Sequence, residues 1–139
     1  MKKLIILVVS MILSASTMHA AEVPEAVKKA FTQKFPTVTN VKWEKENGTE
    51  YEASFVIDSK EMSALYTATG ALKEIETEIP VADLPQAVVD SVNKKYPNAK
   101  IKEAARIDRS DNSVLFEAEI RVGGKKTDIL FDGNGNAVN

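Results

Sequence analysis

The feature that most constrains the fold of this chain is an internal repeat. Residues 23–27 (Val-Pro-Glu-Ala-Val) return as residues 84–88 (Leu-Pro-Gln-Ala-Val), and residues 34–36 (Lys-Phe-Pro) return as residues 95–97 (Lys-Tyr-Pro), both 61 positions later. Residues 51–55 then match 116–120, and residues 65–66 with Gly70 match 130–131 with Gly135, now 65 positions later. Four residues have therefore been added between the blocks, which we place in the turn 109–113. The kept order and spacing indicate a duplication.

Each repeat is predicted to open with a helix, over residues 24–34 and 85–95. Apolar residues recur there at steps of three and four, as at Val27 and Phe31 in the first and Val88 and Val92 in the second. Proline suits the first turn of such helices, and Asp83 followed by Gln86 resembles a capping box. Each predicted helix ends before a second proline.

After each helix the apolar period changes from 3.6 to 2, which predicts strands. Turn signals (Asn47-Gly48, Thr69-Gly70, Gly123-Gly124 and Asn134-Gly135) separate the alternating runs and predict short antiparallel connections. The predicted strands are 40–46, 50–58, 62–68 and 71–78, then 100–109, 113–122, 125–132 and a short 136–138. The expected fold is α+β: a tandem repeat of one helix followed by a four-stranded antiparallel meander, with the helices packed on one sheet face. We expect one domain of two repeats, 23–80 and 84–139.

The N-terminus has the pattern of a secretory signal: Lys2 and Lys3, an apolar run over 4–13 and small residues over 14–20. We expect cleavage after Ala20, so that residues 1–20 are a signal peptide and 21–139 the mature domain, located in the periplasm or secreted. No later apolar run reaches the ~18 residues of a membrane span. We therefore expect no stable membrane insertion after cleavage. An uncleaved N-terminal anchor is the alternative.

A signal followed by two helix-plus-strand units of this kind resembles the PepSY-like secreted proteins, which are similar in fold to the beta-lactamase inhibitory protein. The resemblance extends from about Val23 to Val138 and rests on structural motifs, without a catalytic signature. It implies a fold directly. By analogy it also implies a module that binds or inhibits proteins, although fold alone does not determine function.

The composition of the mature chain excludes several function classes. Cysteine is absent and the single histidine, His19, lies in the signal, so no triad, Cys-His pair or imidazole metal site can form. Removal of residues 1–20 leaves 16 basic and 20 acidic side chains, a net charge of −4. A weakly acidic domain lacks the basic surface that nucleic acids require. We expect no enzyme, no cofactor and no nucleic-acid partner.

Two motifs could carry chemistry, and each has a simpler interpretation. Residues 132–136 (Asp-Gly-Asn-Gly-Asn) space oxygen ligands like the start of a calcium loop, but a twelfth-position carboxylate would fall beyond Asn139, so a hairpin turn is favoured. Glu50, Glu52, Glu117 and Glu119 could form an acid/base pair of the glycosidase type. Alternation instead places them on a solvated strand face, where lysine and arginine can pair with them. We assign no catalytic or metal-binding residue.

Trp43 is the only tryptophan. Burial in the core is its simpler interpretation, since tryptophan is usually largely buried. The equivalent stretch of the second repeat, 101–105, has no aromatic residue. An asymmetric contact surface therefore stays open as an alternative.

The sequence thus favours a secreted, non-catalytic module that recognises or inhibits an envelope protein or peptide through the helix-free sheet face. The candidate partner-binding residues are Trp43, Glu52, Val56, Leu65, Glu117, Glu119, Arg121 and Leu130. The alternative function is a carrier of a small ligand or ion in a pocket between the repeats. A carrier needs an enclosed apolar cavity, whereas a binding module needs a broad exposed face.

Overall fold

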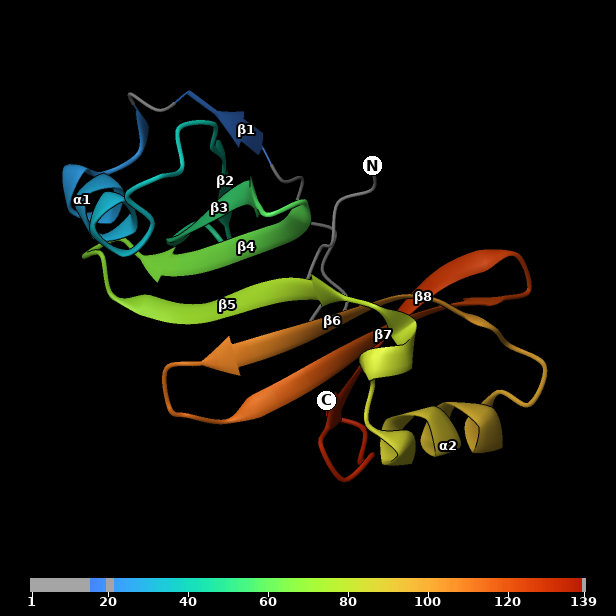
Figure 1. Cartoon of the computed structure of the whole chain (residues 1–139). Helices are drawn as coiled ribbons and strands as arrows, with labels where there is room; N and C mark the ends of the chain where they lie inside the picture. Colours follow the sequence, from blue (N-terminus) through green and yellow to red (C-terminus); the bar gives the residue numbers. More distant parts are fainter. Residues whose placement is uncertain (1–15, 20–21, 139) are drawn as a thin grey trace. The chain divides into compact units, whose positions relative to one another are not determined.

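The structure is a computed structural model of the chain, and it describes residues 16–19 and 22–138 (Figure 1). The cleavage point expected at residues 20–21 and most of the expected signal peptide lie outside the described residues. The chain groups into two compact units. The first unit comprises residues 16–19, 22–78 and 107–113, and the second comprises residues 79–106 and 114–138.

Each unit contains one ten-residue helix with the same ends. Helix α1 (Glu25–Lys34) follows Pro24, and helix α2 (Gln86–Lys95) follows Pro85. Both end on an aromatic residue whose backbone N–H donates to a carbonyl four positions earlier, Phe35 to Phe31 and Tyr96 to Val92, at 2.8 Å each. The predicted helices are confirmed to within one residue.

The predicted capping box is wrong. Helix α2 has no side-chain hydrogen bond at its N-cap, which is Pro85. Asp83 instead belongs to a short 3₁₀ helix, η2 (Val81–Asp83), and Gln86 Nε2 donates to Asp90 Oδ1 at 2.9 Å. Because proline supplies a preset φ at the helix start, this helix begins without a polar cap.

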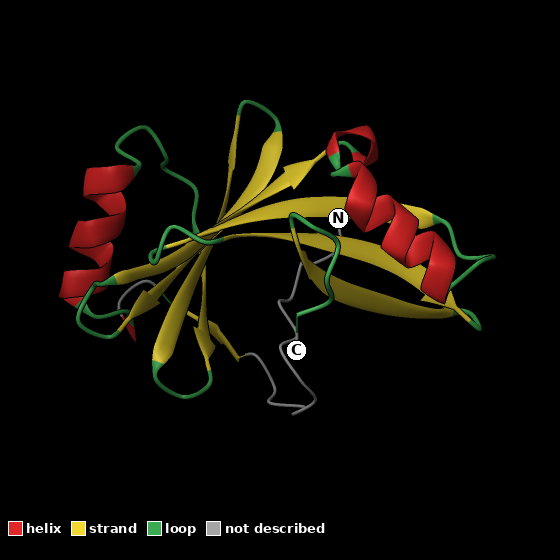
Figure 2. Cartoon of the chain, turned by 90° about the horizontal axis from the view of Figure 1, so that it is seen from below, coloured by secondary structure: helices red, strands yellow, loops and turns green. Residues whose placement is uncertain are grey.

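The strands run antiparallel between short turns (Figure 2). In the first part of the chain they are β1 (Ser16–Met18), β2 (Lys42–Glu46), β3 (Glu50–Ile57), β4 (Lys60–Thr67) and β5 (Leu72–Ile79). Strands β6 (Ile101–Arg109), β7 (Val114–Val122) and β8 (Lys125–Asp132) follow. Within each of these two groups, neighbours in space are neighbours in sequence.

Two differences from the predicted strands matter for function. Strand β1 was not expected, because it lies inside the segment predicted to be a signal peptide. The short strand expected at 136–138 is absent, and only an isolated bridge joins Phe131 to Ala137. The second unit therefore has one regular strand fewer after its helix than the first.

Four turns follow the glycine signals, and two further turns among the described residues have positive φ angles without glycine, one of them at Asn112 in the predicted turn 109–113. Positive φ angles occur at Gly48, Gly70, Gly124 and Gly135, as the hairpin signals predict. The β3–β4 hairpin turns instead at Asp58 and Ser59, with φ of 50° and 64°. Such angles are uncommon outside glycine, although aspartate is enriched among the exceptions. The predicted strands 50–58 and 62–68 place a turn here but do not indicate that it is this tight.

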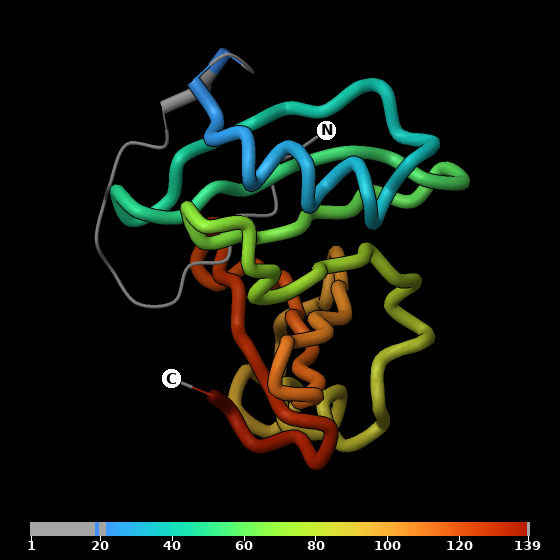
Figure 3. The backbone as a smooth tube through the Cα atoms, turned by 90° about the vertical axis from the view of Figure 1, so that its left-hand side faces the viewer, coloured from blue at the N-terminus to red at the C-terminus, as the bar shows by residue number. Residues whose placement is uncertain are grey.

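The core of the first unit lies between α1 and one face of the sheet. Figure 3 shows α1, in blue, running across the cyan to green strands. Its buried residues are Val23, Val27, Phe31, Trp43, Tyr51, Ala53, Phe55, Ala64 and Tyr66. The core of the second unit comprises Leu84, Val88, Val92, Ala104, Ala118, Ile120 and Phe131, with Phe116 packed against it. These clusters confirm that the apolar positions of the predicted helices, Val27 and Phe31 in the first and Val88 and Val92 in the second, face the core.

A glycine contact joins hairpin to helix in the same way in both units. A Cβ on Gly70 would collide with the carbonyl oxygen of Ala26, and a Cβ on Gly135 would collide with that of Ala87. Both glycines have positive φ angles, 86° and 81°. The backbone of each hairpin therefore lies directly against the first turn of its helix, an approach that only glycine allows.

Candidate functional site

The helix-free face of the first unit is the strand face opposite α1. Residues directly opposite each other on antiparallel strands share a face. The row Trp43, Ala53, Ala64 and Ile75 lies on the α1 side. The next row, one position along each strand, lies on the helix-free face and comprises Glu44, Glu52, Leu65 and Glu74.

Three carboxylates therefore share one four-residue row of this face, and Glu44 lies directly opposite Glu52. Both are buried, with exposed fractions of 4% and 8%. The pKa of Glu52 is raised to about 7, with burial as the largest cause and the charges of Glu46 and Glu44 acting in the same direction. A weak hydrogen bond of 3.4 Å from Ser54 Oγ acts in the opposite direction.

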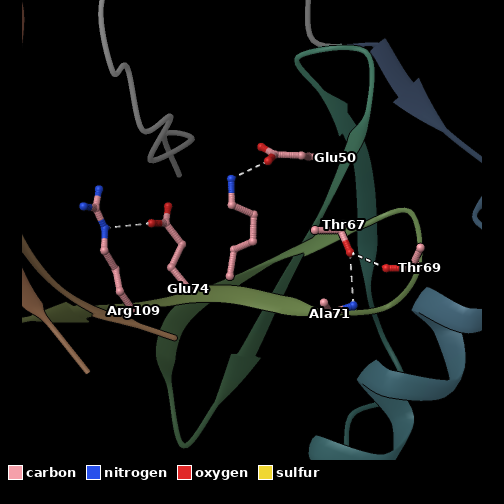
Figure 4. Close-up of polar contacts among 7 residues, drawn as sticks. Glu50, Thr67, Thr69, Ala71, Glu74 and Arg109 are labelled. Atoms are coloured by element: carbon pink, nitrogen blue, oxygen red, sulfur yellow. Dashed lines mark hydrogen bonds and ion pairs between the residues drawn. The ribbon is translucent and has the colours of Figure 1, made fainter. Parts of the chain in front are cut away.

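Cationic side chains pair with several carboxylates at the edges of this cluster. Lys42 Nζ lies 2.6 Å from Glu44 Oε1, and Arg109 Nε donates to Glu74 Oε2 at 3.2 Å. Lys73 pairs with Glu50, and Figure 4 shows this contact beside the Arg109–Glu74 pair. Pairing of this kind was expected, because opposite charges on neighbouring strands attract.

The second unit repeats the arrangement on β7 and β8. Glu117 lies opposite Leu130 and Glu119 opposite Asp128, on the strand face opposite the core residues. Lys126 Nζ lies 2.7 Å from Glu119 Oε2 and 3.9 Å from Asp128 Oδ1. Burial raises the pKa of Glu117 to about 8, with Asp128 contributing in the same direction and Lys126 opposing.

The predicted site residues separate into exposed and covered groups. Val56 is 58% exposed, Arg121 is exposed and Leu65 is half-buried. The other residues predicted on the helix-free face are buried: Glu52, Glu117, Glu119 and Leu130. The expectation of a solvated carboxylate face is therefore wrong. Alternation identifies a face but carries no information on what covers it.

Trp43 lies on the opposite side of the sheet from this face. It is 5% exposed, and its ring packs edge-on to Phe31 with centroids 5.4 Å apart. Core packing therefore accounts for Trp43, and the structure separates it from the other seven candidates. Its large side chain fills space between α1 and β2, as buried aromatic residues usually do.

Sequence reasoning missed Glu44, Glu74, Asp128, Lys126 and Arg109. The first had a usable signal, because the Asn47-Gly48 turn places Glu44 across from Glu52 in a short hairpin. Arg109 had none. It reaches Glu74 from a segment 35 positions later, through a pairing that no local pattern encodes.

The carboxylate of Asp132 accepts hydrogen bonds from residues of its own turn. Asp132 Oδ1 accepts from the backbone N–H groups of Asn134 and Asn136, and Oδ2 accepts from the Asn136 side chain, at 2.9 Å each. These bonds lower the pKa of Asp132. The hairpin-turn interpretation is confirmed. Over the described residues, no cluster of three histidine, cysteine, aspartate or glutamate side chains could hold a metal ion.

The family of the chain follows from comparison with known proteins. The model of the PepSY-like family, described as beta-lactamase-inhibitor-like, matches residues 13–73 and 56–139. The chain belongs to this family. No curated protein is significantly similar in sequence to this PepSY-like chain.

Solved structures share the fold of this PepSY-like chain. A protein of Bacteroides eggerthii described as periplasmic aligns with a TM-score of 0.73 and 16% identity, over 84% of this chain and 86% of that one. A DUF2874 family protein of Bacteroides uniformis aligns with a TM-score of 0.72 and 18% identity, with the same coverage. A BLIP-like protein of Bacteroides fragilis aligns with a TM-score of 0.64 and 25% identity, over 84% of both chains.

These similarities confirm the predicted α+β fold and the predicted family. The predicted location in the periplasm agrees with the description of the Bacteroides eggerthii protein. In the described part of the chain, neither α-helix has the length and apolar character needed to cross a bilayer.

Proposed function

We propose that the mature PepSY-like chain is a non-catalytic binding module of the periplasm, which recognises or inhibits a protein or peptide through its helix-free strand faces. One observation carries the proposal: in each unit the face opposite the core holds buried carboxylates, Glu44 and Glu52 on β2 and β3 in the first unit and Glu117 and Glu119 on β7 in the second. Apolar side chains at these positions would avoid the desolvation of charge. The arrangement is therefore unfavourable for folding alone.

The pairing of acids supports a role in recognition. Like charges directly opposite on neighbouring strands destabilise a sheet, and both units contain such a pair, Glu44 with Glu52 and Glu119 with Asp128. A lysine compensates part of this charge in each unit, Lys42 at Glu44 and Lys126 at Glu119 and Asp128. Perturbed carboxyl groups of this kind are common at functional sites. A face that combines these acids with the exposed cation of Arg121 favours a partner whose polar groups complement both signs of charge.

The exposed residues of the same faces would make the first contacts. Val56 offers an exposed apolar side chain, and Arg121 offers a planar cation that can donate several hydrogen bonds. Few apolar residues are exposed there. We therefore propose an interface of standard size or smaller, whose affinity depends more on charge than on area.

The family supports a protein as the partner. Its description is beta-lactamase-inhibitor-like, and one structural neighbour is BLIP-like. The secretory pattern of residues 1–20 supports export, and we propose that the mature chain begins at or near Ala21.

We also propose that the two units arose by duplication of one helix-plus-strands unit. The family model matches the chain twice. The shared proline starts, aromatic helix ends and glycine contacts with Ala26 and Ala87 support this origin.

The test is partner capture from the periplasmic extract of the source cells by the tagged, exported protein. We expect Val56→Asp and Arg121→Glu each to weaken capture at least about tenfold, because they remove an apolar contact and an interface cation. Lys29→Glu is the matched control, since Lys29 is exposed on α1. Capture should also weaken as salt is raised from 50 to 500 mM, since salt screens exposed charges.

Loss of capture in Lys29→Glu, with both strand variants unaffected, would assign binding to the helix side. Co-purification of a small ligand or ion, with no effect of any variant, would support the carrier function instead.

A further inference from the structure

The edge of the first sheet is occupied by a segment that export is expected to remove. Strand β1 pairs antiparallel with β2 in the register Ser16 with Lys45, Thr17 with Glu44 and Met18 with Trp43. It is the first strand in the order of the sheet, and β2 is the next. All three β1 residues precede Ala20, after which we expect signal cleavage.

Cleavage would remove the strand that pairs with one side of the β2 backbone. A strand uses alternate N–H and C=O groups for its two neighbours, and β3 takes only the inner set of β2. The outer set, which we call the β2 edge, faces β1. Without residues 16–18 these groups lose their partner strand, and an unpaired edge is a template for another extended chain.

We propose that signal cleavage vacates the β2 edge, and that this edge then binds an extended segment of the partner protein as an added antiparallel strand. The inference rests on the proposed function and specifies how the partner is recognised. Affinity would come from main-chain hydrogen bonds, and selectivity from alternate side chains. Register position 17 lies opposite Glu44, so the added strand would extend the helix-free face beside the carboxylate row.

The chain itself indicates the chemistry of the occupant. The segment paired with the β2 edge, Ser-Thr-Met, is short and uncharged. Strand β2 has charged residues at four of five positions: Lys42, Glu44, Lys45 and Glu46. Charges on an edge strand disfavour pairing between copies, and an antiparallel pair of copies centred on Glu44 would place two glutamates opposite each other. An extended segment with small, hydroxyl or other uncharged side chains fits better.

The absence of cysteine allows a direct test by disulfide trapping. The protein is exported from its full gene as Lys45→Cys, and its N-terminus is determined by intact mass. The probe is a synthetic peptide of residues 14–20 with cysteine in place of Ser16, the register partner of Lys45. Lys29→Cys, exposed on α1, is the matched protein control. A peptide with cysteine in place of Thr17 is the register control.

We expect an exported chain that begins at or near Ala21, and trapping of the first peptide on Lys45→Cys at least tenfold faster than on Lys29→Cys. The register-control peptide should be trapped more slowly on Lys45→Cys, because successive strand residues face opposite sides. The trapped protein should no longer capture the partner. An exported chain that retains residues 16–18, or equal trapping rates at the two sites, would overturn the proposal.

The experiments can refute binding by the helix-free face and binding by the β2 edge independently of each other. If Val56→Asp loses the partner while the trapped protein keeps it, the helix-free face binds and the β2 edge does not. If the trapped protein loses the partner while the face variants keep it, the edge binds and the face does not. A mature dimer that the peptide dissociates would identify a second copy as the occupant and overturn the choice of a partner segment.

Discussion

The two units build similar cores from different side chains. In the first unit Phe31 packs against Phe35, Trp43 and Phe55 with ring centroids 5.1 to 5.4 Å apart. The residues 61 or 65 positions later are smaller: Val92 for Phe31, Ala104 for Trp43 and Ile120 for Phe55. Both cores still close against a helix of ten residues. The comparison shows that prolines and glycines set the backbone layout, while core volume varies between units.

The largest expected effect is the loss of stability caused by a substitution in the aromatic core of the first unit. Phe31→Ala should lower the free energy of unfolding by about 3–5 kcal/mol, because a cavity replaces a ring that contacts three others. Val92→Ala, at the equivalent position, removes fewer atoms and should cost about 1–2 kcal/mol. Urea denaturation of both variants measures the difference. Equal losses would show that the aromatic cluster adds nothing beyond the aliphatic one.

The buried carboxyl groups should make stability fall as pH rises. The pKa of Glu52 rises from 4.5 to about 7 and that of Glu117 from 4.5 to about 8, so between these values the folded chain binds more protons than the unfolded chain. The stability that these protons contribute is fully present below about pH 4.5, and it is lost as the pH rises through 7 to 8. Each group should contribute a loss of about 3 kcal/mol between pH 5 and pH 8.

Glutamine variants measure the contribution of each unit to the pH dependence of stability. Glu52→Gln and Glu117→Gln resemble the protonated acid, so each should flatten part of the pH dependence and be more stable than the parent at pH 8. Thermal melts from pH 5 to pH 8 measure this. A parent protein that becomes more stable over that range would contradict the burial of these acids.

The hairpin glycines should matter equally in both units. Gly70→Ala and Gly135→Ala combine a positive φ with a collision against a helix carbonyl, so each should cost about 2 kcal/mol. Gly48→Ala has a positive φ but no atom within 4 Å of the new Cβ, and it serves as the control for φ alone. If Gly48→Ala lowers the free energy of unfolding as much as Gly70→Ala does, the collision with the helix carbonyl does not contribute to the loss.

The smallest expected effect concerns the hydroxyl of Tyr66. The ring is 1% exposed, burial raises the pKa of the hydroxyl to about 12, and the hydroxyl makes no hydrogen bond with the described residues. The equivalent residue of the second unit is Phe131, which has no hydroxyl. Tyr66→Phe should therefore leave stability unchanged or raise it by up to about 1 kcal/mol. A loss above 1 kcal/mol in urea denaturation would show that the hydroxyl has a partner.

The parts of the fold that depend on local pattern could be predicted from the sequence. Helical period, flanking prolines and turn glycines placed both helices and most strands within two residues. The strands predicted over 50–58 and 62–68 placed a connection between them, but its two-residue turn at Asp58 and Ser59 was not predicted, because no glycine marks the positive φ angles there. Strand β1 was missed because an apolar, small-residue N-terminus indicates a signal and says nothing of pairing.

The candidate site was predicted less completely, for a different physical reason. Alternation correctly placed Glu52 and Glu117 opposite the core, since the side-chain period of a strand is 2. Alternation does not encode how deeply these acids are buried, and it does not encode contacts between distant segments such as the Arg109–Glu74 pair. Such contacts leave no periodic trace in the sequence.

The discontinuous first unit has a consequence for the order in which the chain assembles. Its residues 107–113 come after α2, and Ser110 N–H donates to the carbonyl of Lys73 on β5 at 2.8 Å. A chain that crosses a membrane N-terminus first can form its early hairpins at once, because their contacts are local. It cannot complete the outer side of β5 near Lys73 until about thirty-five further residues have emerged. In the export that we propose, this backbone would stay open to chaperones and to mispairing during translocation, and completion of the first unit would depend on passage of the second helix.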